Sequence, residues 1–151
     1  MSDSISLSPH IVVSNAAAAI DFYKAAFGAE EQVRHLAPNS GKVMHASLKI
    51  AGSNLMLNDD FSAAMGHKPE TAEALGGCPV VFHIQTKDAD AAWAKALAAG
   101  ATVRMPLADQ FWGDRYGLLR DPFGLYWSIS QTISKPTPAE IEEKAKTIFK
   151  L

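Results

Sequence analysis

The stretch WGDRYGLLRDPFGLYWSIS, residues 112–130, decides how this chain folds. At its centre, residues 121–124 read Asp-Pro-Phe-Gly. The proline fixes φ, the glycine permits a positive φ, and the aspartate can accept hydrogen bonds from the turn backbone. Apolar and aromatic residues on both sides predict two strands joined by this turn. The alternation places Leu125, Trp127 and Ile129 toward a hydrophobic core and Tyr126, Ser128 and Ser130 on the opposite face. We therefore expect a hairpin in which Ser128 faces any cavity on that side.

Length and charge favour one ordinary domain. The chain has 151 residues, a net charge of −2 and 20% charged residues. It therefore has no excess of basic residues that would predict binding to nucleic acid or to an anionic membrane. The first twenty residues lack a secretory pattern, and no apolar run is long enough to span a membrane. We expect a cytoplasmic protein. The single cysteine, Cys78, excludes an intrachain disulfide and a cysteine-rich metal site.

Two halves of the chain repeat the same order of elements. In each half, a strand is followed by a helix that ends at glycine and then by further strands. Gly28 corresponds to Gly100 and Gly52 to Gly124, with the same offset of 72 residues, which predicts an internal repeat. The expected elements of the first half are strands at 6–13, 33–36, 43–50 and 53–57 and a helix at 16–27. Those of the second half are strands at 79–86 and 102–105, a helix at 88–99, and the hairpin.

These patterns predict an α+β fold made of two β-α-β-β-β units, about 5–58 and 79–131. A connection at 59–78 shows no sustained periodicity, and we leave open whether it is a lid over the site. The tail, 132–151, contains an amphipathic helix with Ile141, Ala145 and Ile148 on one side.

The run GDRYGLLRDPFGLYWSIS resembles the last hairpin of the glyoxalase/bleomycin-resistance/extradiol-dioxygenase (vicinal oxygen chelate) superfamily. Residues 20–30, IDFYKAAFGAE, resemble its first helix, and the WGDRYG run is similar to the PhnB-like branch. The resemblance covers residues 5–131. It implies that the two units form curled mixed sheets around a small-molecule cleft, and that the protein is a homodimer.

The same resemblance implies where a divalent metal would bind. Many members of the superfamily use two His or Gln side chains and two carboxylates, from the first and fourth strands of each unit. In this chain the matching positions are Ser8, Met56, Val81 and Ser128. None of these is a normal ligand of a divalent metal. We therefore expect no metal cofactor at the inherited positions.

Histidines leave a second possibility open. His10 and His83 lie two residues beyond the inherited positions on their strands, so alternation points them toward the same face. They could form a shifted two-histidine metal site, contact a ligand without metal, or be hydrogen-bonded residues in or near the core. His45, on a neighbouring strand, is a further candidate for the same wall. No comparable argument singles out His35 or His67.

Aromatic residues precede the central hairpin. Trp112, Arg115 and Tyr116 could rim the cleft and hold a planar or anionic molecule by stacking and charge. In the equally good alternative, Trp112 packs under the long connection, and Arg115 pairs with Asp114 or Asp121 on the surface. The set expected to contact a ligand is His10, His45, Met56, His83, Trp112, Arg115, Tyr116, Tyr126 and Ser128.

Three hypotheses for function remain after the sequence alone. The first is a metal-free protein that binds a small molecule in the cleft. The second is a metal-dependent lyase, isomerase or dioxygenase that uses His10 and His83. The third is a dimeric structural module whose cleft is filled. The sequence contains no phosphate-binding glycine loop and no Gly-x-Ser-x-Gly nucleophile turn. It does not identify a catalytic residue or a substrate.

Overall fold

The computed structural model describes residues 4–150, which form two four-stranded sheets. The first unit contains β1 (His10–Val13), α1 (Ala16–Phe27), β2 (Glu30–Leu36), β3 (Val43–Ile50) and β4 (Ser53–Asp59). Its strand order is β1-β4-β3-β2, in which only the β1–β4 pair is parallel. Residues 1–3 and 151, at the two ends of the expected domain, lie outside the described part.

The second unit repeats this topology and confirms the predicted fold class. It contains β5 (Val81–Gln85), α3 (Ala89–Ala99), β6 (Thr102–Asp109), β7 (Asp114–Arg120) and β8 (Tyr126–Thr132). The strand order β5-β8-β7-β6 matches that of the first sheet, and β5 again runs parallel to β8. Each unit thus begins with a strand at the open edge of its sheet, so β1 and β5 both have one side without a neighbouring strand.

Several segments differ from the sequence expectation: β2 begins at Glu30 and not at residue 33, β5 spans Val81–Gln85 and not 79–86, and β6 continues to Asp109 and not only to residue 105. The first strand begins at His10 and not at residue 6, because Pro9 has no N–H to donate and only its carbonyl pairs, with the N–H of Met56. The connection between the units contains a single 3₁₀ turn, η1 (Ser62–Met65), and one helical turn, α2 (Ala72–Leu75). Elements of four residues are too short to leave a periodic pattern in the sequence.

Equivalent side chains anchor the main helices of the two units. Asn15 caps α1, and the buried carboxylate of Asp59, at the end of β4, accepts a hydrogen bond from the N–H of Ala16 at 2.7 Å. In the second unit Asp88 caps α3, and Gln131, at the end of β8, accepts from the N–H of Ala89 at 3.0 Å. The last strand of each sheet thereby fixes the start of the helix that covers it.

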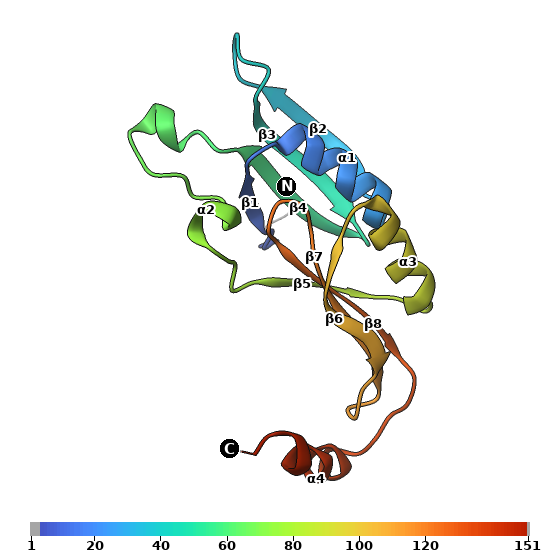
Figure 1. Ribbon diagram of the computed structural model, residues 1–151. Coiled ribbons are helices and arrows are strands. Elements are labelled where there is room, and N and C mark those ends of the chain that lie inside the picture. Colours follow the sequence, from blue (N-terminus) through green and yellow to red (C-terminus); the bar gives the residue numbers. More distant parts are fainter. Residues whose placement is uncertain (1–3, 151) are drawn as a thin grey trace.

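The helices join the two units. Figure 1 shows α1 and α3 side by side, and the two helices pack against each other. Phe27 of α1 stacks on Trp127 of β8 with ring centroids 4.3 Å apart, and Tyr23 contacts the same indole at 5.2 Å. Leu125, Trp127 and Ile129 are buried, as the alternation in β8 predicts. The core is therefore shared between the repeats.

The C-terminal helix α4 (Pro138–Ile148) lies apart from both sheets. Thr137 caps it by accepting from the N–H of Glu140, and Ile148 and Phe149 remain more than half exposed. No residue of α4 is buried. An isolated helix of this length is marginal in water, so α4 depends on packing against another surface. Among the described residues, no helix is both long and apolar enough to cross a membrane.

Replacing Gly124 by Val should destabilise the fold. Gly124 has φ 88°, and a Cβ there would lie 3.3 Å from side-chain atoms of Ala72 and Glu73, so Val adds backbone strain to a tight contact with α2. The expected loss is about 1–3 kcal/mol of unfolding free energy. Lys49→Val, at an exposed position in β3, is the matched control. Equal urea midpoints for Gly124→Val and the parent would show that the turn tolerates a side chain.

Replacing Tyr23 by Phe should remove a buried hydrogen bond to Asp121, at 2.7 Å. The expected cost near neutral pH is about 1.5–3 kcal/mol, because the acceptor is a carboxylate. Burial, followed by the neighbouring Asp121 charge, raises the pKa of Tyr23 well above 10.0.

The unfolded chain therefore releases the Tyr23 proton first, and the parent loses stability as the pH rises above 10.0. Tyr23→Phe has no proton to release at this position. The stability difference between parent and variant should narrow with rising alkaline pH, as measured by urea unfolding at several pH values. A constant difference would contradict this linkage.

Candidate functional site

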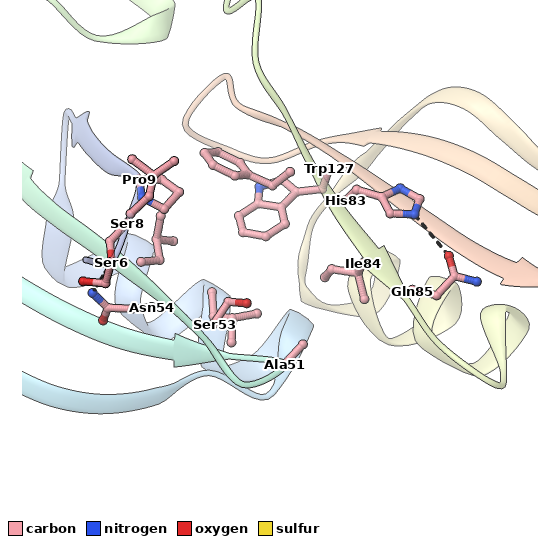
Figure 2. A pocket seen from close by; sticks show the side chains of 14 residues that line it. Ser6, Ser8, Pro9, Ala51, Ser53, Asn54, His83, Ile84, Gln85 and Trp127 are labelled. Carbon is pink, nitrogen blue, oxygen red and sulfur yellow. Dashed lines mark hydrogen bonds between the residues drawn. The ribbon is translucent and has the colours of Figure 1, made fainter. Parts of the chain in front are cut away.

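Two cavities of about 600 Å³ each lie between the first unit and β5. The first is bounded by residues 6–9 and the β3–β4 turn, and the second by β1. Pro9, Phe82 and His83 line both cavities, so the two adjoin at this point. Figure 2 shows Ser6, Ser8 and Pro9 on one side of the first cavity and His83, Ile84 and Gln85 on the other, with Trp127 beside Pro9. The second cavity is lined mainly by apolar residues, together with His10, His83, Cys78 and the carboxylate-bearing Glu70. A volume of this size suits a small organic molecule.

His83 is held in one orientation by neighbours on the sheet. Ser128 is its register partner on β8, and the Ser128 hydroxyl lies 2.7 Å from His83 Nδ1. The other ring nitrogen, Nε2, lies 3.2 Å from Gln85 Oε1, and the Gln85 amide donates to Thr132 Oγ1 at 3.1 Å. This series of hydrogen bonds places the imidazole proton on Nε2, because Gln85 Oε1 can only accept a hydrogen bond. Nδ1 then accepts from the Ser128 hydroxyl.

His10 occupies the equivalent register position in the first unit but has different partners. Its register partner is Met56, and its Nε2 hydrogen-bonds Asn58 Oδ1. The ring also meets His45 edge-on, with centroids 6.2 Å apart, and His45 stacks with His35 at 6.3 Å. His10, His45 and Met56 therefore share one face of the first sheet, as alternation predicts.

Aromatic rings continue from His83 across the second sheet. The Tyr116 ring is stacked against His83 with centroids 6.1 Å apart, and Trp112 meets Tyr116 edge-on at 5.5 Å. The Trp112 indole N–H donates to Asp114. Next to Tyr116, the buried hydroxyl of Ser130 has no hydrogen-bond partner within residues 4–150. This face therefore offers stacking surface, whereas the Ser130 hydroxyl is fully buried beneath it.

Arg115 lies on the opposite face of the same sheet. Its guanidinium forms ion pairs with Asp90 of α3 at 2.9 Å and with Asp109 of β6 at 3.0 Å. The hydrogen bond from Arg115 lowers the pKa of Asp90, and the bonds to Asp90 and Asp109 raise the pKa of Arg115. The structure thus separates Arg115 from Trp112 and Tyr116, and its partners differ from the Asp114 or Asp121 that the sequence suggested. Tyr126 remains on the Ser128 face.

The side chains at the inherited metal positions do not fit a divalent cation. Ser128 is buried and bonded to His83, Met56 offers a thioether, and Ser8 accepts from Asn54 at 3.0 Å. His10 Nε2 and both ring nitrogens of His83 already face amide or hydroxyl groups. Over residues 4–150, no three His, Cys, Asp or Glu side chains are arranged to hold a metal. The side chains at these positions offer no carboxylate for a hard cation and no third histidine for a borderline one.

Two neighbours of the predicted residues were not identified from the sequence. Gln85 lies two residues after His83 on the same face of β5, so alternation alone could have included it. His35 pairs with His45 only because Met44 is an extra residue at a β-bulge. Regular pairing, counted from the turn between β2 and β3, would have placed Met44 opposite His35. Met44 lies on the other face of the sheet from His45.

Comparison with known proteins finds relatives that are similar to this chain in sequence and in fold. Over 136 residues, the chain is 50% identical to an uncharacterized protein of Mycobacterium bovis, covering 90% of this chain and 89% of the relative. A crystal structure of an Arabidopsis thaliana gene product superposes with a TM-score of 0.67 at 33% identity, covering 84% of this chain and 98% of that one.

A PhnB protein from Bacillus cereus, described as a putative 3-demethylubiquinone-9 3-methyltransferase, has the same fold. Its TM-score is 0.66 at 18% identity, over 84% of this chain and 99% of that one. The family model for the Glyoxalase/Bleomycin resistance protein/Dioxygenase superfamily matches residues 5–129. With two β-α-β-β-β units and this match over most of its length, the chain belongs to the glyoxalase/bleomycin resistance protein/dioxygenase superfamily.

Proposed function

We propose that this protein binds a small organic molecule in the cleft between β1 and β5, without a divalent metal. The observation that carries the proposal is the pair of adjoining cavities, each of about 600 Å³, with His83 at their junction. Hydrogen bonds to Ser128 and Gln85 hold the imidazole in place. A rigid polar group at the junction of a mixed and a mainly apolar cavity can orient a ligand, and because the group is already held in place, little side-chain entropy is lost on binding.

The sheet faces next to the cavities support a planar ligand. Tyr116 and Trp112 extend the aromatic surface from His83 beyond the cavities. In the first unit His10 lines the second cavity, and His45 and Met56 lie beyond it on the same sheet face, where they add imidazole and thioether groups. Binding of this kind needs no catalytic residue. The cytoplasm is the compartment that we propose, consistent with the single unpaired cysteine, Cys78.

We also propose that the protein is a homodimer. The segment before β1 alternates apolar and polar residues, and Ile5 and Leu7 are 99% and 98% exposed. At the other end of the chain, Ile148 of α4 and the next residue, Phe149, are both more than half exposed. Apolar side chains left this exposed at both ends favour burial against another surface, and a second copy is always available.

Protein purified without chelator should retain a small molecule and no stoichiometric metal. The test is native mass spectrometry together with elemental analysis, with His83→Ala as the site variant and His67→Ala as the control. We expect His83→Ala to lose the retained molecule, because it removes the group fixed at the junction of the cavities, and His67→Ala to keep it. Near-stoichiometric Zn, Ni, Mn or Fe that disappears in His10→Ala or His83→Ala would instead establish the metal-dependent enzyme.

Light scattering at micromolar concentration should give twice the chain mass of 16.2 kDa. The double variant Ile5→Ser/Leu7→Ser should weaken the dimer, because it removes apolar surface that association would bury. Met65→Ser, at a 70% exposed position in η1, is the matched control. A monomeric mass that stays unchanged on tenfold concentration would contradict the proposal.

A further inference from the structure

Arg104 lies on the Ser128 face of the second sheet. Thr102 pairs with Arg120, the register partner of Tyr126, so alternation along β6 places Arg104 on the same face as Tyr126. Its guanidinium lies over the Tyr126 ring of β8, 5.1 Å from the ring centroid. The side chain therefore crosses β7 to reach the second strand along. Val103 pairs with Leu119 and Met105 with Leu118, so a β-bulge leaves Arg104 without a partner of its own on β7.

The hydrogen-bond donors of this guanidinium are unused within residues 4–150. Arg104 forms no ion pair or side-chain hydrogen bond there, and its one contact with a charged or aromatic group is the Tyr126 ring. Arg115, by contrast, is neutralised by two carboxylates on the other face. A guanidinium held over an aromatic face keeps its N–H edges free to bind a planar oxyanion through two hydrogen bonds.

Arg104 and Tyr126 lie outside the two cavities, on the sheet face that they share with Ser128 and His83. Tyr126 and Ser128 are successive residues on the same face of β8, roughly 7 Å apart along the strand. Ser128 bonds to His83. Arg120 is the register partner of Tyr126 on β7 and adds positive charge, although its guanidinium lies toward Gly124 and Glu73 of α2. Arg104 is therefore the better placed of the two cations for a ligand in contact with His83.

We propose that Arg104 and Tyr126 form an anion subsite, and that the cleft ligand carries a carboxylate or phosphate on a planar organic body. This inference rests on the proposed small-molecule function and adds the charge of the ligand. In the bound state the oxyanion accepts from the Arg104 guanidinium, and the planar body lies toward His83 and Tyr116. Tyr126 keeps the arginine extended across β7, which lowers the entropy lost on binding.

The test uses benzoate, its neutral analogue benzamide, and inorganic phosphate as probes. Binding is followed by NMR on the His83 imidazole and on the Arg104 side-chain Nε–H of the full chain. In the parent protein we expect benzoate to bind at least tenfold more tightly than benzamide and to shift both resonances. Arg104→Gln should bring the affinities of the two probes together, whereas Arg104→Lys should restore part of the difference because it keeps the charge. Arg34→Gln, which removes the same charge from a residue paired with Glu31 on the other sheet, is the matched control.

The outcomes separate the anion subsite from the cleft function. Equal binding of benzoate and benzamide to the parent, with shifts at His83, would overturn the subsite and leave the small-molecule function standing. Unchanged benzoate affinity in Arg104→Gln would overturn it as well, and so would the absence of benzoate and phosphate binding. Saturable phosphate binding that depends on Arg104 would support the subsite and favour phosphate over carboxylate as the ligand group. Because Arg104 is exposed, its substitution leaves the core intact, and thermal melting checks this directly.

Discussion

The carboxylate of Asp121 holds the two halves of this protein together. One of its oxygens, Oδ1, accepts from the N–H groups of Phe123 and Leu125 at 2.8 and 3.0 Å, and thereby closes the turn between β7 and β8. The other, Oδ2, accepts from the Tyr23 hydroxyl of α1 and the Trp127 indole of β8 at 2.7 and 2.9 Å. A buried anion without a cation persists only when its lone pairs are satisfied. Local turn geometry and contact between the repeats therefore depend on one side chain.

The placement of the cleft follows from this arrangement. Tyr23 and Phe27 bring α1 against Trp127, and α1 packs on α3, so the two sheets are joined through their helices and not through paired strands. The edge strands β1 and β5 are left facing each other across the second cavity. A direct β1–β5 ladder would have closed this space. The open edges thus leave space between the repeats, in which we propose that the ligand binds.

The sequence predicted the parts of the site that depend on alternation and repetition. His83 with Ser128 and His10 with Met56 are register partners, as the glycine offset and a period of two imply. It failed where a bulge inserts one residue. The extra residue Met44 places His45 opposite His35, and the register shift in β6 places Met105, in addition to Arg104, opposite Leu118. Arg115 was assigned to the cleft from its neighbours Trp112 and Tyr116, but as the residue next to Tyr116 it must face the other side. Bulges and long-range ion pairs depend on tertiary contacts that no local pattern contains.

The two repeats have diverged in the one place where their symmetry would build a metal site. At matching positions, Ser128 donates a hydrogen bond to His83, whereas Met56 cannot bond to His10, which turns to Asn58 instead. The second unit consequently holds its imidazole in a chain that continues to Gln85 and Thr132, and the first unit presents a looser group of histidine rings. A divalent metal needs several convergent ligands, and within residues 4–150 no three His, Cys, Asp or Glu side chains converge. An organic ligand has no such need, since one end can be fixed by hydrogen bonds at His83 while the other packs against His10 and Met56. The asymmetry therefore favours a ligand with distinct ends over a symmetric ion.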